Sequence, residues 1–191
     1  MKAIETFYKG YHFRSRLEAR WAVFFDALNV QYRYEWEGYD LGGAGHYLPD
    51  YWLPEQQLFV EIKGVDPFDV PHTEMDKIEA LRGRIVLFGG NIEIPLGGLL
   101  FAYDVHITGS GGESEWPIVW AFCEKHSRYE LTFGDERHEI YRDVAMREPL
   151  MPCMHKAATW HIDEKILAAV LAARAARFEH GETPTLGGSC D

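Results

Sequence analysis

The sequence predicts an α/β (α+β) domain in which a helix is followed by three antiparallel strands, a second helix and a further strand. Apolar residues recur at helical spacing over residues 14–28 and again over 73–83. Between these helices, residues 31–63 are rich in β-forming residues and are interrupted by Gly and Pro. Hydrophobic residues make up 47% and aromatic residues 14% of the 191 residues, which is typical of a chain with a substantial core.

The first helix is expected from about Arg14 to Leu28. Glu18 lies three residues before Trp21, so we expect it at the border of the buried face. Alternatively, Glu18 forms an ordinary intrahelical ion pair with Arg14, four residues earlier. The apolar residues that should pack this helix on the sheet share helical spacing: Leu17, Trp21, Phe24, Phe25 and Leu28.

Residues 31–41 are expected to form the first strand, because aromatic and charged residues alternate there, with a bend at Gly38. The glycine-rich segment 42–46 then leads into a β-hairpin over residues 47–63. The four residues PEQQ connect its two strands, and Pro54 suits the opening of the turn. This loop length predicts that the residues on either side of it, Leu53 and Leu58, face each other across the hairpin.

That register brings charged side chains together on one face of the hairpin. Asp50 falls opposite Glu61, with Cβ atoms about 5 Å apart. Lys63 follows on the same face as Glu61, because side chains alternate along a strand. The other face is apolar and should meet the core; it carries Pro49, Tyr51, Val60 and Ile62.

Asp50 and Glu61 predict a site for a hard divalent cation, because two neighbouring carboxylates repel each other. Mg²⁺ takes oxygen ligands and keeps several waters, which suits two carboxylates, a nearby backbone carbonyl and a substrate phosphate. A phosphodiester is the natural substrate of such a site. The alternative is an exposed cross-strand charge cluster that contributes little to stability and carries no chemistry.

Beyond the hairpin, the sequence predicts a helix from near Thr73 to Gly83, a strand over 84–90 and another strand within 91–107. Residues 1–108 are therefore expected to form the core domain, and the Gly/Ser-rich segment 109–115 a linker. We expect a C-terminal lobe over 116–180, which includes a helix from about Asp163 to Phe178, and a flexible tail over 181–191.

The C-terminal lobe contains two Cys/His pairs with the chemistry of a zinc site. Cys123 and His126 are expected in a turn between two strands, and Cys153 and His155 form a second pair, with His161 in reserve. Four ligands from two arms would hold a structural Zn²⁺, as in a zinc ribbon. Alternatively, these residues are unrelated neighbours across a turn. The three cysteines do not make a disulfide framework.

The formal net charge of -11 argues against tight, indiscriminate binding to nucleic acid. Basic residues nevertheless cluster within residues 1–20. We consider Arg14, Arg16 and Lys77 as candidates for phosphate contacts, although such residues are more often solvated surface residues. His46, just before the hairpin, is expected to be structural. The sequence has no long apolar run and no signal-peptide pattern, so we expect a cytoplasmic protein without a membrane partner.

The order of elements, with Glu18 on the first helix, Pro49-Asp50 on the second strand and Glu61-Ile62-Lys63 on the third, resembles the PD-(D/E)XK nuclease superfamily. The segments FRSRLEARWAVFFDAL, YLPDYWLP and FVEIKG look like those of small phage- and prophage-type members, over roughly residues 8–90. The resemblance implies a restriction-endonuclease-like core. It also implies that the protein acts in the cytoplasm of a bacterial or phage-infected host cell.

The resemblance further implies a role for each matching residue. Asp50 and Glu61, with the backbone carbonyl of Ile62, would hold Mg²⁺ or Mn²⁺, and Lys63 would orient or activate the attacking water. Glu18 would be the acidic contribution from the first helix. We therefore expect a metal-dependent nuclease that cleaves phosphodiester bonds in DNA, with a homodimer as one arrangement for cutting both strands. The alternative is a catalytically silent module that binds nucleic acid or protein on a nuclease scaffold.

Overall fold

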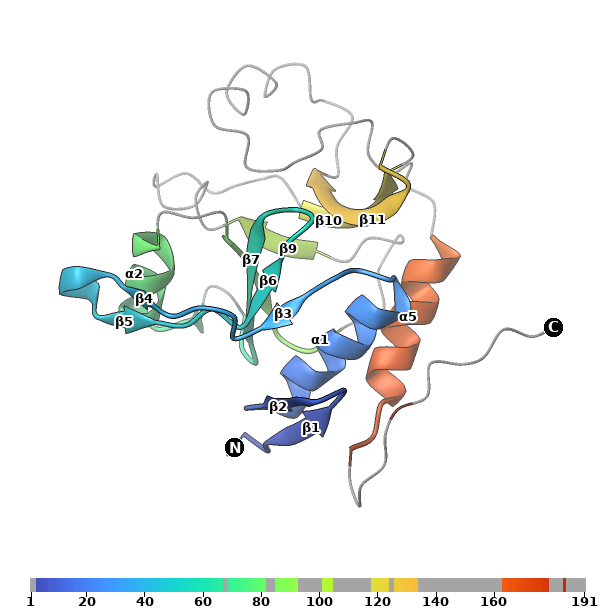
Figure 1. The fold of residues 1–191 in the computed structure, drawn as a ribbon, viewed down its shortest axis with the longest axis horizontal. Helices are drawn as coiled ribbons and strands as arrows, with labels where there is room; N and C mark the ends of the chain where they lie inside the picture. The colour runs from blue at the N-terminus through green and yellow to red at the C-terminus, as the bar shows by residue number, and fades with distance from the viewer. Residues whose placement is uncertain are drawn as a thin grey trace.

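The protein is built around a mixed β-sheet, which the computed structural model in Figure 1 shows with helices packed against it. The structure describes residues 3–66, 69–81, 85–92, 101–104, 118–123, 126–133, 163–178 and 184. In these ranges the fold is mixed α+β, and the main sheet has seven strands in the order β11-β10-β9-β8-β7-β6-β3. Two small sheets, β1-β2 and β4-β5, have two strands each.

The elements of the N-terminal half follow the predicted order, preceded by a short hairpin. This hairpin consists of β1 (Thr6–Tyr8) and β2 (Tyr11–Phe13). The next elements are α1 (Arg16–Ala27), β3 (Arg33–Tyr34), β4 (Tyr39–Asp40), the 3-10 turn η1 (Gly42–Ala44) and β5 (His46–Tyr47). They are followed by β6 (Tyr51–Leu53), β7 (Leu58–Lys63), α2 (His72–Ala80) and β8 (Ile85–Gly89). The remaining described elements are β9 (Phe101–Asp104), β10 (Ile118–Cys123), β11 (Arg128–Phe133) and α5 (Glu164–Ala175).

Helix α1 begins where Ser15 caps it, since the Ser15 hydroxyl oxygen accepts a hydrogen bond from the backbone N–H of Glu18. The predicted apolar face is confirmed, and Trp21, Phe24 and Phe25 are all buried. Their aromatic rings belong to one core cluster with residues of the sheet and of α5, and α5 lies alongside α1 in Figure 1. The helix ends before Asn29, whose positive φ of 55° turns the chain away.

The first strand is shorter than the sequence predicts. Instead of continuing over 31–41, it breaks at Glu35, whose φ of 44° is incompatible with an extended strand. The backbone N–H of Glu35 donates to the carbonyl oxygen of Asp50, so the break joins the start of β6. Residues beyond the break form the separate β4-β5 sheet instead of extending β3, so the bend expected at Gly38 occurs three residues earlier.

The hairpin of β6 and β7 has the register that the loop length predicts. Leu53 pairs with Leu58, and Tyr51 pairs with Val60. Gln57 adopts a positive φ of 50° in the connecting turn. Strand β7 also pairs with β8 in parallel, with Glu61 opposite Leu87, and α2 lies in the crossover between them. Parallel pairing places β7 inside the sheet and buries most of it.

The two faces of β7 meet different hydrophobic clusters. One face packs with α1 and α5, through Leu58, Val60 and Ile62. The other face was expected to be polar, but Phe59 joins a second cluster with Ile78 of α2. Glu61 lies on this second face and is only 3% exposed, so the alternative of an exposed charge cluster is wrong for this residue.

The described part of the range 116–180 continues the main sheet instead of forming a core of its own. Strand β9 pairs with both β8 and β10, and Trp120, Leu131 and Val170 join the cluster around α1. Tyr129 of β11 donates to the carboxylate of Asp163, which also caps α5. Helix α5 thus falls within the predicted helix and is anchored to the sheet. The predicted linker 109–115 lies outside the described residues, as does the tail 181–191 apart from residue 184.

Candidate functional site

The charged face of the hairpin opens into a cleft of about 820 Å³. Residues from α1, the β4-β5 sheet, β7 and α2 line it, so four separate parts of the chain meet there. Most of the residues singled out from the sequence are among its lining: Arg14, Glu18, His46, Asp50, Glu61, Ile62, Lys63 and Lys77. The cleft therefore brings together most of the residues that the sequence pattern indicated.

Asp50 and Glu61 are linked through the backbone of the hairpin. The carboxylate of Asp50 accepts a hydrogen bond of 2.7 Å from the N–H of Ile62. The carboxylate of Glu61 in turn accepts one of 3.3 Å from the N–H of Asp50. This reciprocal arrangement holds the two acids side by side, as the predicted register requires.

Asp50 is the acid that the site leaves least well compensated. Its enclosure by protein raises the pKa of Asp50 well above the usual range, and the nearby charges of Glu61 and then Glu18 raise it further. The N–H of Ile62 and the charge of Lys63 act in the opposite direction but do not cancel this shift. The cleft therefore favours any cation that can approach Asp50.

Lys63 bridges two acids at the rim of the cleft. Its Nζ lies 2.9 Å from Oε1 of Glu61 and 2.8 Å from Oε2 of Glu74. Burial by itself lowers the pKa of Lys63, but the attraction of these two carboxylates outweighs burial and raises the pKa overall. Lys63 is thus a fixed positive charge in the absence of other cations.

Glu18 lies at the border of the buried face of α1, as predicted, and is 8% exposed. Its carboxylate accepts 2.5 Å hydrogen bonds from the hydroxyls of Ser15 and Tyr34. It also accepts one from the backbone N–H of Arg14. The ion pair between Glu18 and the Arg14 side chain is not formed, because the Arg14 guanidinium pairs with Glu35 at 2.6 Å. These hydrogen bonds hold Glu18 near the start of α1, where its negative charge contributes to the raised pKa of Asp50.

The three candidates for phosphate contacts are placed differently. Arg14 and Lys77 both line the cleft, Arg14 from the segment before α1 and Lys77 from α2. Arg16, two residues after Arg14 and at the start of α1, is not among the residues that line the cleft. His46 faces the cleft from β5.

Two residues of the site escaped the sequence analysis. Tyr47 donates a 2.7 Å hydrogen bond to Glu61, and burial followed by the charge of Glu61 raises the pKa of Tyr47, so the hydroxyl keeps its proton. Glu74 pairs with Lys63 from the first turn of α2. The alternation of the strand could have pointed to Tyr47. Nothing local marks Glu74, since its role depends on where α2 packs.

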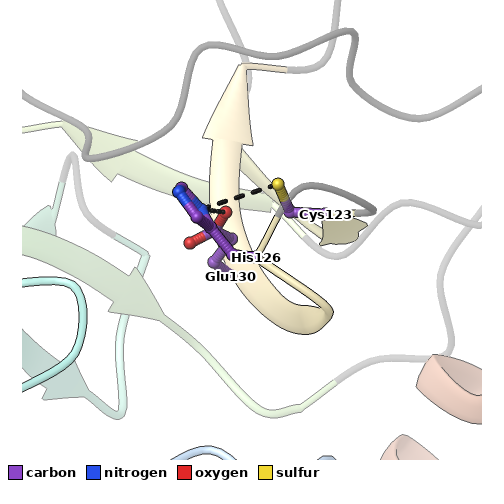
Figure 2. Close-up of side chains that lie close together, drawn as sticks. All are labelled: Cys123, His126 and Glu130. Atoms are coloured by element: carbon purple, nitrogen blue, oxygen red, sulfur yellow. Dashed lines mark hydrogen bonds and ion pairs between the residues drawn. The ribbon is translucent and has the colours of Figure 1, made fainter.

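A second group of metal-capable side chains lies at the turn between β10 and β11 (Figure 2). Ligand atoms of Cys123, His126 and Glu130 all lie within 4.8 Å of one another, a spacing that the cleft acids do not share among the described residues. His126 occupies the predicted turn, whereas Cys123 is the last residue of β10, just before it. Glu130 was not anticipated. The other predicted zinc ligands, Cys153 and His155, and the reserve ligand His161 lie outside the described residues.

Comparison of the chain with protein-family models, with curated proteins and with solved structures found no match. In the part of the chain that the structure describes, no helix has the length and apolar character needed to cross a membrane.

Proposed function

We propose that this protein is a divalent-metal-dependent nuclease with a PD-(D/E)XK, restriction-endonuclease-like core, which hydrolyses phosphodiester bonds in DNA. The observation that carries the proposal is the meeting of Asp50, Glu61 and Lys63 in one cleft. Glu61 and Lys63 lie on β7, and Asp50 directly precedes the neighbouring strand β6. The resemblance of the surrounding sequence to small phage-type nucleases supplies the reaction class.

The donor set fits Mg²⁺ or Mn²⁺. Two neighbouring carboxylates in an enclosed site provide hard oxygen ligands. The pKa of Asp50 is raised by burial and then by the charges of Glu61 and Glu18, and a bound cation would offset these charges. Asp50 and Glu61 would hold the ion with the carbonyl of Ile62, while Glu18 would add its charge from α1. When bound, such an ion lowers the pKa of a coordinated water and stabilises charge on the phosphate.

Lys63 contributes as a cation rather than as a base. Because its pKa is raised by Glu61 and Glu74, Lys63 keeps its proton and can donate hydrogen bonds to a water or to a phosphate oxygen. Glu74 holds the ammonium group in place from α2. Tyr47, by donating to Glu61, orients that carboxylate toward the cleft.

Substrate would reach the cleft against a net charge of -11, so local cations matter. Arg14 and Lys77 both line the cleft and would contact the phosphates that flank the scissile bond. These two cations favour contact with a short stretch of the nucleic-acid backbone, because binding along a long stretch would need more basic residues.

A cleavage panel with single-stranded, double-stranded and branched DNA, plus RNA, tests the proposal in Mg²⁺ and in Mn²⁺. We expect metal-dependent cleavage of DNA that is abolished by chelation and by Asp50→Asn or Glu61→Gln. Asp76→Asn, at an exposed position on α2, is the matched control and should cleave normally. Full activity in the Asp50 and Glu61 variants would refute the site. Binding of nucleic acid without turnover would support the catalytically silent module instead.

A further inference from the structure

We propose that Cys123, His126 and Glu130 bind a zinc-type transition metal ion at the β10-β11 turn, at a second site outside the acidic cleft. The group is shown in Figure 2, where the three side chains converge from the two strands and the turn between them. This inference is independent of the nuclease proposal, because none of its ligands lines the cleft.

Pairing of the two strands brings the ligands together. Cys123 pairs with Arg128, and Ala121 pairs with Glu130, so Cys123 and Glu130 project from the same face of the hairpin. His126 lies in the turn, next to Ser127, whose φ of 51° tightens the reversal of the chain. The opposite face carries Trp120 and Leu131, which are buried in the core and fix the orientation of the hairpin.

The spacing of sulfur and nitrogen matches zinc coordination. Sγ of Cys123 lies 3.6 Å from Nδ1 of His126. Zinc bonds of about 2.3 Å to sulfur and about 2.0–2.1 Å to nitrogen, at a tetrahedral angle, separate the two ligand atoms by roughly 3.6 Å. Oε1 of Glu130 lies 2.8 Å from the same Nδ1, a direct hydrogen-bond distance. Metal binding therefore requires this oxygen to move outward by about half an ångström.

The arrangement argues for a ligand set rather than for a nucleophile with its base. In a Cys-His-acid relay, the thiol and the carboxylate contact different ring nitrogens. Here both approach Nδ1 of His126, so they compete for one proton position. A cation that replaces this proton would satisfy the thiolate, the imidazole and the carboxylate together.

Burial and charge favour the same conclusion. Glu130 is only 1% exposed, and Arg128 holds its second oxygen at 3.2 Å, which leaves Oε1 facing His126. Arg128 is itself fixed by a 2.9 Å hydrogen bond to the carbonyl oxygen of Glu55. Such outer hydrogen bonds orient metal ligands. Sulfur and nitrogen donors select Zn²⁺ over the Mg²⁺ that suits the cleft.

Cobalt titration of the full-length protein tests the site, because Co²⁺ bound to thiolate gives a charge-transfer absorption band. After removal of metal by chelation, we expect one equivalent of Co²⁺ to produce this band and Zn²⁺ to displace it. Cys123→Ser should abolish the band, and His126→Ala should weaken binding strongly. Arg128→Gln should weaken binding by about 10- to 100-fold, as is typical for groups that orient ligands.

Controls separate this result from the cleft and from misfolding. Cys190→Ser and Asp50→Asn should keep the full band, since neither alters the proposed ligands. Far-ultraviolet circular dichroism of the metal-free Cys123→Ser protein should match that of the wild type. The proposal is overturned if wild type gives no band, or if the band survives in Cys123→Ser and disappears in Cys153→Ser. It is also overturned if His126→Ala binds Co²⁺ as tightly as wild type.

Discussion

The acidic cleft and the Cys-His-Glu group at the β10-β11 turn are assembled in opposite ways. In the cleft, hairpin pairing brings Asp50 and Glu61 together, while Glu18 and Glu74 are supplied by two helices distant in sequence. At the turn, Cys123, His126 and Glu130 all lie within eight consecutive residues of one hairpin. The first site therefore depends on the tertiary structure, whereas the second needs little beyond local strand pairing.

The two sites also differ in how their charge is compensated. Glu61 and Glu130 are both buried, but Glu61 pairs with Lys63, and Glu130 pairs with Arg128 and His126. Asp50 lacks comparable compensation, and its raised pKa shows the consequence. Excess negative charge at Asp50 suits a hard cation, whereas the mixed S, N and O donors at the turn suit a softer one.

The largest expected effect is on the proposed cleavage activity of the cleft. Lys63→Ala should lower cleavage by about 10²- to 10⁴-fold, the usual range for a group that positions a proton or water in the transition state. Initial rates on a labelled duplex measure it. Lys165→Ala, which removes an exposed lysine from α5, is the control and should retain the wild-type rate. Equal cleavage rates for Lys63→Ala and Lys165→Ala would show that Lys63 has no role in cleavage.

The next effect tests the physical connection between the two regions. The side-chain oxygen of Gln56, in the β6-β7 turn, accepts a 3.0 Å hydrogen bond from the buried N–H of Leu131 in β11. Gln56→Ala leaves this N–H without its partner and should lower the free energy of unfolding by about 1–3 kcal/mol. Urea denaturation provides the measurement. Gln57→Ala, at the exposed neighbour, should change stability little, so similar losses in both variants would contradict the role of Gln56.

A smaller effect of opposite sign is expected at Asp50. Because the folded state raises the pKa of Asp50, its contribution to stability is present at low pH and is lost as pH rises through the folded pKa. Asp50→Asn should therefore stabilise the metal-free protein at neutral pH, because the amide carries no charge to bury. Thermal unfolding in chelator at several pH values measures this gain.

The gain from Asp50→Asn should shrink toward acidic pH, where wild-type Asp50 is protonated in both states. Asp76→Asn serves again as the exposed control. An Asp50→Asn variant that is less stable than wild type at neutral pH would show that the charge of Asp50 is well compensated. Asp50 and Glu130 would then not differ in charge compensation.

The smallest effect is expected at Glu74. Its ion pair with Lys63 is half exposed, so Glu74→Gln should cost less than about 1 kcal/mol of stability. Cleavage should fall only a few-fold, because Lys63 keeps Glu61 as a partner. Glu79→Gln, one turn further along α2, is the matched control. A rate loss as large as that of Lys63→Ala would place Glu74 among the groups that contact substrate or metal.

Local patterns predicted several features well. Helical spacing identified α1 and its buried aromatic face, and the loop length between Leu53 and Leu58 set the hairpin register. Both follow from short-range geometry: the period of a helix, the period of a strand and the span of a tight turn. The same rules predicted the turn that contains His126, whereas Cys123, expected in that turn, ends strand β10.

Tertiary packing determined the features that these short-range rules do not predict. Glu35 breaks the first strand because its N–H bonds to Asp50, and strands β10 and β11 continue the main sheet. Whether Glu61 faces water or a second core depends on α2, and the partnership of Lys63 with Glu74 depends on the same helix.

The sequence by itself thus determined which acids and which cation share a face, because alternation along paired strands is a local property. Only the tertiary structure decided that this face is enclosed and that Glu18 is held by Ser15 and Tyr34. The physical reason is that burial and charge compensation are set by elements far apart in the chain, which no local pattern specifies.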